Sequence, residues 1–525
     1  MLKVSGLRFS CLPSDAELKR EAARTLGVKE SKIVSVRVFR RSVDARRGGA
    51  AFVYTVLAEC ENEEKILTKN IKNATLYSEK SYVFPYSGIK TDSRPLIVGM
   101  GPAGLFCALA LCEAGVKPVL IERGRDVDTR TADVERFWQG GELDTESNVQ
   151  FGEGGAGTFS DGKLVTGIND ARIEWFLRRL VSFGAPEDIL WLSAPHVGTD
   201  RLKIAVKALR EHLISLGCEV RFETTLTDIE ITNGAVSAAV LACGGKEEIF
   251  AADTIVLAPG NGARDTFEML SRKGISLAPK SFSIGVRIEH LQREIDLAQY
   301  GSAGIFPPSS YKLVEHLPSG RSVYSFCVCP GGQVVASASE RGRTVTNGMS
   351  LYARDGENIN GALLVGVSPE DYPEGALGGI ELQRKIESAC FASAGSYRAP
   401  AQLLGDFLLK RPSAKAGKVK PSYRPGVTFT NLWGILPEFI CTSLADALPR
   451  FGRKIRGFDD PEAVLTAVES RSSCPVRILR GEDFQSLNVR GLFPCGEGAG
   501  YAGGITSSAV DGVKCAEAVA GILLN

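Results

Sequence analysis

Histidine is scarce in this chain, and its cysteines show none of the spacings that bind metals. Only four histidines occur among 525 residues. The 13 cysteines are scattered, and no two of them form a Cys-x-x-Cys pair. Zinc sites and disulfide frameworks both depend on regular spacings of cysteine or histidine. The sequence therefore predicts neither a metal centre nor a disulfide-stabilised fold.

Long apolar segments are also lacking. No uninterrupted apolar run is long enough to span a bilayer, and no basic-then-apolar leader precedes a cleavage site. We therefore expect a cytoplasmic protein with no membrane partner. The hydrophobic content of 44% and the charged content of 23% are those of an ordinary globular protein. A chain of 525 residues is too long for one compact core, so we expect two or three domains.

The net charge of +1 conceals an uneven distribution along the chain. Residues 1–90 contain 17 Lys and Arg against 10 Asp and Glu, so this segment is basic and the remainder is mildly acidic. Periodicity and capping residues predict strands at 2–9, 33–41, 51–59 and 82–85 and helices at 15–26 and 61–70. This order of elements is typical of a ferredoxin-like domain.

Five arginines surround one predicted hairpin of this segment: Arg37, Arg40, Arg41, Arg46 and Arg47. Such a cluster suits a docking surface for RNA, for a protein or for an electron carrier. It also suits a solvated strand face that packs on the main domain. We favour the second interpretation, because no aromatic residues alternate with the arginines to stack on bases.

The strongest motif lies between residues 94 and 124. A short apolar strand leads into Gly99-Met100-Gly101-Pro102-Ala103-Gly104, a small-residue helix follows, and a second strand ends on Glu122 and Arg123. The three glycines permit a tight turn, close approach of backbone to a pyrophosphate, and close packing of helix on strand. The helix start holds the phosphates, and the acid accepts from a ribose. The unit predicts a dinucleotide-binding site.

A second glycine-rich segment, FGEGGAGTFSDGKL, covers residues 151–164. It is very similar to a segment of bacterial FAD-dependent dehydrogenases of an uncharacterised family, relatives of the glutathione-reductase and geranylgeranyl-reductase flavoproteins. The resemblance extends over about residues 94–525 and implies non-covalently bound FAD. It places Gly154, Gly155, Thr158 and Ser160 near the cofactor, where glycine lets N–H groups crowd a dianion and a flat ring.

Two further segments carry the same resemblance. In the superfamily, the residue corresponding to Leu226 contacts adenine through its backbone. We expect it in a three-strand meander formed by residues 219–222, 226–231 and 235–241. The turn Ala258-Pro259-Gly260 resembles the superfamily's Ala-Thr-Gly signature, which approaches FAD.

The last segment of the chain resembles the flavin end of such a site. A strand ends at Gly496-Glu497, and a glycine loop leads through Gly504 into a helix that begins near Ile505 and Thr506. The resemblance implies that Glu497 binds the ribityl hydroxyls. The helix start then stabilises negative charge that develops on the flavin during reduction.

The predicted fold class is α/β: a Rossmann-like FAD-binding domain with an inserted α+β substrate domain and an N-terminal ferredoxin-like α+β domain. We expect the N-terminal domain at 1–90, the FAD-binding domain at 91–264 and 475–525, and the insertion at 265–474. After residue 264, no second glycine triplet opens a strand–turn–helix unit. We therefore expect no separate NAD(P)H domain, and electrons arrive from a transient ligand or from a partner protein.

Four polar residues are candidates for the catalytic acid or base, in the order His196, Asp161, Lys163 and Arg287. His196 lies on a loop near the second glycine segment, although a loop histidine is more often structural. Asp161 and Lys163 face the flavin or cap a turn. These alternatives stay open at the level of sequence.

Cys327 and Cys329 alternate on a strand predicted at 322–328. On a regular strand their side chains point the same way about 7 Å apart, which is too far for an unstrained disulfide. We therefore predict structural cysteines rather than a redox pair. Cys329, which precedes a turn, is the one that stays a weak candidate.

The predicted function is that of an FAD-dependent oxidoreductase, a dehydrogenase or reductase, which transfers a hydride between a small organic substrate and flavin N5. NAD(P)H and a redox partner protein are the candidate electron donors. One alternative is a flavoenzyme that acts on RNA or on a protein presented by the basic N-terminal domain, although a nucleic-acid partner is less favoured. The other is a non-enzymatic flavin-binding sensor, for which so large an insertion is unexpected.

Overall fold

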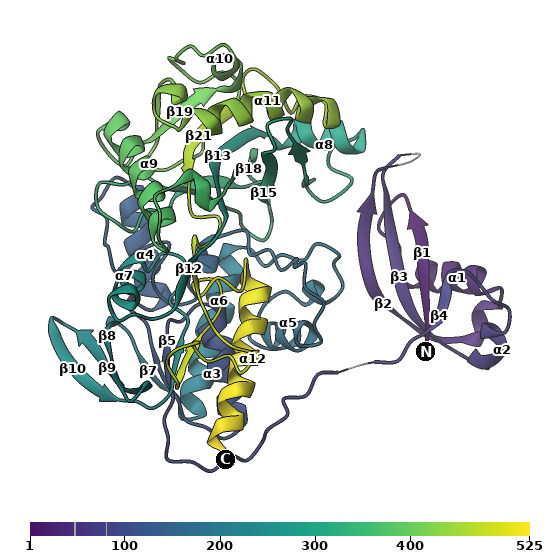
Figure 1. Ribbon diagram of the computed structural model, residues 1–525. Coiled ribbons are helices and arrows are strands. Elements are labelled where there is room, and N and C mark those ends of the chain that lie inside the picture. Colours follow the sequence, from purple (N-terminus) through teal and green to yellow (C-terminus); the bar gives the residue numbers. More distant parts are fainter. Residues whose placement is uncertain (47–48, 80, 525) are drawn as a thin grey trace.

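The computed structural model describes residues 1–46, 49–79 and 81–524. Figure 1 shows a small N-terminal domain beside a larger body, with the chain between them running along the base of the body. The predicted basic turn includes Arg47 and Gly48, which lie outside the described residues. In the part of the chain that the structure describes, no helix has the length and apolar character needed to cross a membrane.

The N-terminal domain has the predicted ferredoxin-like fold. Its antiparallel sheet has the strand order β2-β3-β1-β4, and the helices pack on it through an apolar core. Ser14 caps α1, because its Oγ accepts from the backbone N of Glu17 while the Glu17 carboxylate accepts from the backbone N of Ser14. The elements are β1 (Leu2–Phe9), α1 (Asp15–Leu26), β2 (Ile33–Asp44), β3 (Ala51–Cys60), α2 (Glu63–Leu67) and β4 (Ala74–Leu76).

The prediction of a last strand at 82–85 was wrong. Strand β4 lies earlier in the chain, and Tyr82, Phe84 and Tyr86 instead pack against the core of the larger body. The Tyr82 ring meets Trp175 edge-on with the ring centroids 6.3 Å apart. These aromatic side chains bury apolar surface against the body.

The N-terminal domain touches the body along strand β2. The backbone N of Arg41 donates to the O of Trp191 (2.8 Å), and the N of Ser193 donates to the O of Arg41 (2.9 Å). Phe52 packs on Phe306, with the ring centroids 4.9 Å apart. The domain is therefore attached by hydrogen bonds and apolar contact.

Two of the hairpin arginines have acidic partners. Arg46 pairs with Asp44 at 2.9 Å, and Arg37 lies 3.7 Å from Glu79. These neighbours partly neutralise the basic cluster, which favours packing over nucleic-acid docking.

A five-stranded parallel sheet with the order β23-β11-β5-β6-β7 forms the centre of the body. Helices α3 and α12 pack on each other so closely that a Cβ at Gly512 of α12 would clash with the backbone O of Ala103 of α3. The strands are β5 (Leu96–Val98), β6 (Val119–Ile121), β7 (Glu219–Arg221), β11 (Ile255–Leu257) and β23 (Leu492–Pro494). The helices are α3 (Pro102–Glu113), α4 (Val127–Trp138), α5 (Arg172–Ser182), α6 (Thr199–Ser215), α7 (Arg264–Arg272) and α12 (Ile505–Leu523).

The predicted meander is shifted by one strand. Strand β7 pairs in parallel with β6 and belongs to the central sheet. The antiparallel meander consists of β8 (Thr224–Thr232), β9 (Ala235–Cys243) and β10 (Lys246–Ala251). Strand β10 was not predicted, because it begins with the charged, exposed residues Lys246, Glu247 and Glu248. Such residues are typical of an edge strand.

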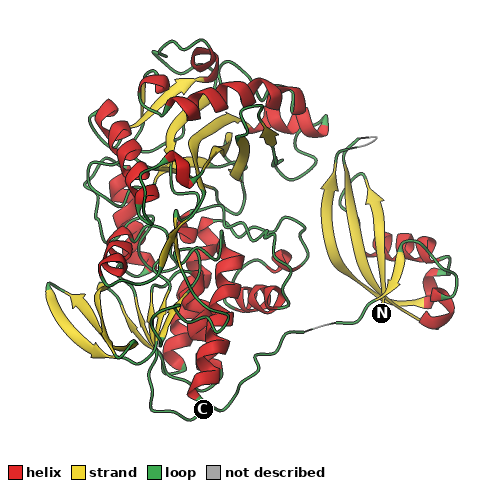
Figure 2. Cartoon of the chain, viewed as in Figure 1, coloured by secondary structure: helices red, strands yellow, loops and turns green. Residues whose placement is uncertain are grey.

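A second α/β unit, the cap, lies above the nucleotide-binding sheet in Figure 2. Its seven-stranded sheet has the order β14-β15-β18-β13-β21-β19-β20, and helices cover it. The strands are β13 (Phe282–Leu291), β14 (Val314–His316), β15 (Ser322–Cys329), β18 (Asn358–Val367), β19 (Ala399–Leu403), β20 (Val427–Phe429) and β21 (Val464–Glu469). The helices are α8 (Gln292–Tyr300), α9 (Gly378–Ala394), α10 (Leu404–Leu408) and α11 (Glu438–Lys454).

Small elements complete the chain. Strands β12 (Leu277–Pro279) and β22 (Val476–Ile478) pair where the chain enters and leaves the cap. Strands β16 (Gln333–Ala336) and β17 (Thr346–Met349) form a separate pair. Single 3-10 turns occupy Glu30–Lys32, Ala156–Phe159, Glu187–Leu190, Pro369–Asp371 and Leu432–Gly434.

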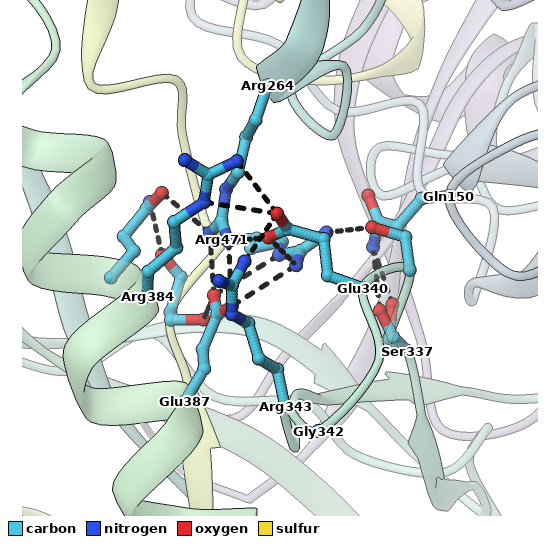
Figure 3. A network of polar contacts seen from close by, with 12 residues as sticks. Gln150, Arg264, Ser337, Glu340, Gly342, Arg343, Arg384, Glu387 and Arg471 are labelled. Atoms are coloured by element: carbon cyan, nitrogen blue, oxygen red, sulfur yellow. Dashed lines mark hydrogen bonds and ion pairs between the residues drawn. The ribbon is translucent and has the colours of Figure 1, made fainter. Parts of the chain in front are cut away.

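A buried network of charges joins the cap to the nucleotide-binding unit (Figure 3). Arg264 on α7 donates from both terminal nitrogens to Glu387 on α9, at 2.7 and 2.8 Å. Arg471, which follows β21, lies 3.2 Å from the same carboxylate. Burial alone would raise the pKa of Glu387, but the two arginines hold it well below its usual range. Glu340 and Arg384 extend the network.

Replacing Glu387 by Gln is expected to destabilise the cap by about 3–5 kcal/mol, because Arg264 and Arg471 then lose their shared buried carboxylate. Differential scanning calorimetry of the purified protein checks this. The control is Glu21→Gln on α1, whose partner Arg24 is exposed, and its effect should be at most about 1 kcal/mol. Equal, small effects of both changes would contradict the structural role of the network.

Candidate functional site

A cavity of about 320 Å³ lies where the predicted cofactor segments meet the cap. Its wall contains most of the residues that the sequence assigned to the cofactor: Gly99, Gly101, Pro102, Ala103, Glu122, Arg123, Gly155, Ser160, Leu226, Ala258, Gly260, Glu497, Gly504 and Ile505. Residues of the first and the last predicted cofactor segments thus line one space. The cap contributes Phe326, Cys327, Asn347 and Glu469 to the same wall.

The glycines of the first turn have different surroundings: two are packed against backbone, and one borders free space. Gly99 has a φ of +99°, and a Cβ there would clash with the backbone O of Ala258. A Cβ at Gly104 would clash with the O of Gly99, so this residue serves helix packing and does not line the cavity. A Cβ at Gly101 would instead meet nothing nearer than the Cα of Gly155, at 4.0 Å. Space is therefore left where a pyrophosphate is expected.

The start of α3 faces this space. Gly101 is the N-cap, no side chain caps the helix, and Pro102 occupies the first turn. An uncapped helix start offers backbone N–H groups and the positive end of the helix dipole to an anion. The second glycine segment approaches from the other side, where Gly155 has a φ of +63°.

Glu122 has a structural role that the sequence did not reveal. Its buried carboxylate accepts from the backbone N of Met100, Gly124 and Gly152, each at 2.9 Å. It therefore ties the first glycine turn to the second glycine segment while lining the cavity. The ribose contact that the sequence predicts stays a prediction, and it would use the acceptor capacity that these three bonds leave.

The predicted adenine end is formed by the start of β8 and by Arg123. Leu226 is buried and lines the cavity together with the turn at Ala258 and Gly260. Arg123 is held by Glu146 and Asp265, each at 2.9 Å, and its guanidinium lies 4.2 Å from the centre of the Phe151 ring. A fixed planar cation therefore borders this end of the cavity.

At the opposite end, Glu497 lines the cavity and precedes the glycine loop that leads into α12. Burial raises the pKa of Glu497 to about 7, against the opposing effect of Lys280. Gly504 is the N-cap of α12 and has no side-chain cap, so this helix start also faces the cavity. A carboxyl group that is neutral or charged near pH 7 can pair with the hydroxyls of a sugar alcohol.

Four assigned residues lie behind the wall. Gly154 and Thr158 line a separate apolar cavity of about 30 Å³ against α5 and α6. Gly496 packs on Ala103 and donates its backbone N to Asp511 at 2.7 Å. The Thr506 hydroxyl donates to the backbone O of Leu164 at 2.8 Å. These residues shape the wall instead of facing the cavity.

His196 and Asp161 lie outside the cavity lining. His196 Nε2 is 3.0 Å from the backbone O of Tyr352, and the two rings stack. Burial, followed by the charge of Arg354, lowers the pKa of His196, so the imidazole is neutral at pH 7. Asp161 is fully buried and accepts from Arg354 at 2.6 and 2.9 Å. Burial opposes the ionisation of Asp161, but Lys163 and Arg354 lower its pKa. The polar contacts of His196 and Asp161 are therefore with Tyr352 and Arg354, outside the cavity lining.

Lys163 and Arg287 have different positions. Lys163 lines the cavity, and its Nζ lies 3.8 Å from Asp161 Oδ2. That Nζ is buried and has no hydrogen-bond partner among the described residues. Arg287 is fully buried beneath the wall, where its Nη2 donates to the backbone O of Cys327 at 3.0 Å.

Sequence reasoning missed Glu469, the last residue of β21. Only 4% of it is exposed, it lines the cavity, and its Oε2 lies 3.6 Å from Arg287 Nη1. Burial raises the pKa of Glu469 to about 7, although Arg287 opposes this. The only signal in the sequence was an acid at the end of an apolar strand.

The prediction that Cys327 and Cys329 project in parallel from a regular strand was wrong, because β15 contains a bulge. Phe326 pairs with Ala362 and Cys329 with Asn360, so two residues of β15 face one residue of β18. Cys327 lies in this bulge with a φ of +42° and lines the cavity, whereas Cys329 is fully buried. The two side chains therefore have different surroundings.

One cluster has ligand types that suit a metal, although none was predicted. Cys495, Asp511 and Cys515 lie together in the buried interior. The Asp511 carboxylate is already bound by Arg480 at 2.6 and 2.9 Å and by the backbone N of Gly496. An arginine thus supplies the positive charge that a metal ion would bring.

The wall fits FAD on its own evidence. The backbone at Gly101 leaves room for a dianion, two uncapped helix starts line the cavity, and Glu122 and Glu497 stand at opposite ends. Every segment that the resemblance named contributes at least one residue to the cavity lining.

Gly101→Ala is expected to abolish flavin binding while leaving the fold intact, because the added Cβ meets only the space where the pyrophosphate is expected. The ratio of flavin to protein absorbance measures the loss, and circular dichroism monitors the fold. The control is Gly167→Ala, where a Cβ meets nothing within 4 Å and which does not line the cavity. Full flavin content in Gly101→Ala would contradict this placement of the pyrophosphate.

Comparison with known proteins identifies relatives of this chain. The chain is 45% identical over 525 residues to an uncharacterised protein of Clostridium beijerinckii, covering 98% of each chain. The family "FAD-dependent protein, C-terminal domain-like" matches residues 281–472, and "FAD binding domain" matches residues 92–133. A domain of unknown function matches residues 1–59.

Solved structures show weaker likeness. The flavin-dependent brominase Bmp2 is 13% identical with a TM-score of 0.40, over 82% of this chain and 80% of that chain. A geranylgeranyl bacteriochlorophyll reductase-like protein of Thermoplasma acidophilum is 13% identical with a TM-score of 0.35, over 82% and 78%. The full-length relative and the family matches carry the assignment: the chain belongs to the family of the Clostridium beijerinckii protein, a family of FAD-dependent proteins, and its cofactor is FAD.

Proposed function

We propose that the protein is an oxidoreductase that transfers a hydride between a small organic substrate and N5 of its FAD. The observation that carries this proposal is the continuity of one cavity wall from the nucleotide segments to the cap. Gly101 and Leu226 line it at one end, and Phe326, Asn347 and Glu469 line it from the cap. A cofactor held by the first set would present its reactive part to the second.

When bound, FAD supplies the hydride acceptor or donor, and the protein supplies orientation and proton transfer. Lys163 Nζ, buried in the wall without a hydrogen-bond partner among the described residues, would hold a carbonyl or carboxylate oxygen of the substrate. Glu469 would give or take the proton that accompanies the hydride, because a pKa of about 7 suits either direction near neutral pH.

The electron donor is part of the proposal. A nicotinamide would bind transiently in the cap side of the cavity, since the sequence offers no second dinucleotide motif after residue 264. The N-terminal domain would then be a packing domain: β2 is attached to the body at Trp191, and Arg37 and Arg46 have acidic neighbours.

Anaerobic titration of the purified holoprotein with NADH, and separately with NADPH, is expected to bleach the flavin absorbance. Deuterium at the transferred position of the nicotinamide should slow the bleaching, because a hydride moves in that step. Gly101→Ala protein, expected to lack flavin, is the control for flavin-independent oxidation. Bleaching by dithionite but by neither nicotinamide would contradict hydride delivery from NAD(P)H.

A further inference from the structure

Cys327 and Cys329 differ in every respect that distinguishes the two members of a redox-active thiol pair. Cys327 is half-buried and lines the FAD cavity, whereas Cys329 is fully buried behind it. Cys329 Sγ lies 3.3 Å from the backbone O of Cys327. Redox pairs commonly combine an accessible thiolate with a shielded resolving thiol.

The charges around the pair reinforce the difference. The neighbouring Cys329 thiol, with the positive charges of Lys163 and Arg287, lowers the pKa of Cys327 to about 6 against the opposing effect of burial. Burial raises the pKa of the Cys329 thiol well above its usual value. Arg287 Nη2 reaches the backbone O of Cys327 at 3.0 Å and Cys329 Sγ at 3.5 Å, so one guanidinium fixes both residues.

Two further groups in this part of the wall have buried polar atoms that a ligand could bind. Glu469 is more than nine-tenths buried, lines the cavity, and its Oε2 has no hydrogen-bond partner among the described residues. Lys163 Nζ is likewise buried and has no hydrogen-bond partner among the described residues. The Cys327 thiol also interacts electrostatically with Glu497, the residue assigned to the ribityl chain. Cys327 therefore lies within reach of the flavin end of the cavity.

The bulge changes the geometry of the two sulfur atoms. On a regular strand, side chains two residues apart project in parallel and are too far apart for an unstrained disulfide. Residues 327 and 328 instead face the single residue Gly361, so this part of β15 is released from regular pairing. Such a segment can adjust when its sulfur atoms join or separate.

We propose that Cys327 and Cys329 form a second redox centre, a disulfide that reduced FAD converts to a thiolate on Cys327 and a thiol on Cys329. In that step the S–S bond breaks, Cys327 leaves as the thiolate, and one S–H bond forms on Cys329, while reduced FAD provides two electrons and one proton and becomes oxidised. Glu469, beside Cys327, is placed to relay this proton. The proposal requires bound FAD but no organic substrate, so it stands apart from the proposed function.

Photoreduction tests the proposal, because in anaerobic EDTA and light the electrons enter the protein through the flavin. Air-oxidised holoprotein is illuminated, denatured in acid and then alkylated. The mass of the peptide that contains both cysteines is measured by mass spectrometry. We expect no alkylation of Cys327 and Cys329 in the dark sample and double alkylation after illumination. Two modified sulfurs in the dark sample, or an intact disulfide under a fully bleached flavin, would overturn the proposal.

Variants sharpen this result. In Cys327→Ser, Cys329 should be alkylated with or without light, because it has lost its partner. Cys441→Ser, a buried cysteine of the cap away from the cavity, should behave like the wild type. If Cys327→Ser does not fold, the comparison of dark and illuminated wild-type protein still decides. Failure to find an organic substrate would leave this test unaffected.

Discussion

The buried carboxylate of Glu122 is the interaction on which the site depends. It accepts three backbone N–H groups, at Met100, Gly124 and Gly152, and so fixes two glycine segments that are distant in the chain. A buried carboxylate is stable only when such donors satisfy it. Once these segments are joined, the backbones of Gly101 and Gly155 lie against each other in the cavity wall, and the uncapped start of α3 lines the same wall. The anion site thus follows from the protein's own hydrogen bonds.

The cap completes the wall of the cavity beside this nucleotide site. The bonds of Arg264 and Arg471 to Glu387 hold α7, α9 and the end of β21 together. Because Glu469 and Arg471 lie two residues apart, the charge network that fixes the cap also fixes the position of the acid in the wall. Packing and chemistry are therefore coupled: a change that loosens the network should displace Glu469 as well.

Local motifs were predictable from sequence, whereas the cap side of the cavity was not. Gly99 to Glu122 is one continuous strand–turn–helix–strand unit that can be recognised from adjacent residues, although the bond of Glu122 to the distant Gly152 cannot. The capping box at Ser14 and Glu17 was equally local. Glu469 and Cys327 became visible only through the pairing of β13, β15, β18 and β21 and through a bulge, which no short window of sequence records. His196 was favoured by its loop position, but its ring stacks on Tyr352, which is distant in the chain.

The central claim is that the flavin ring lies against the wall formed by Lys163 and the cap. The reduction potential of the bound FAD tests it most directly, in wild-type protein and in Lys163→Met. A nearby positive charge stabilises the negative charge gained on reduction, so its removal should make the potential more negative. Lys415→Met, an exposed change in the cap that leaves the cavity untouched, should have no effect. An unchanged potential in Lys163→Met would contradict the account.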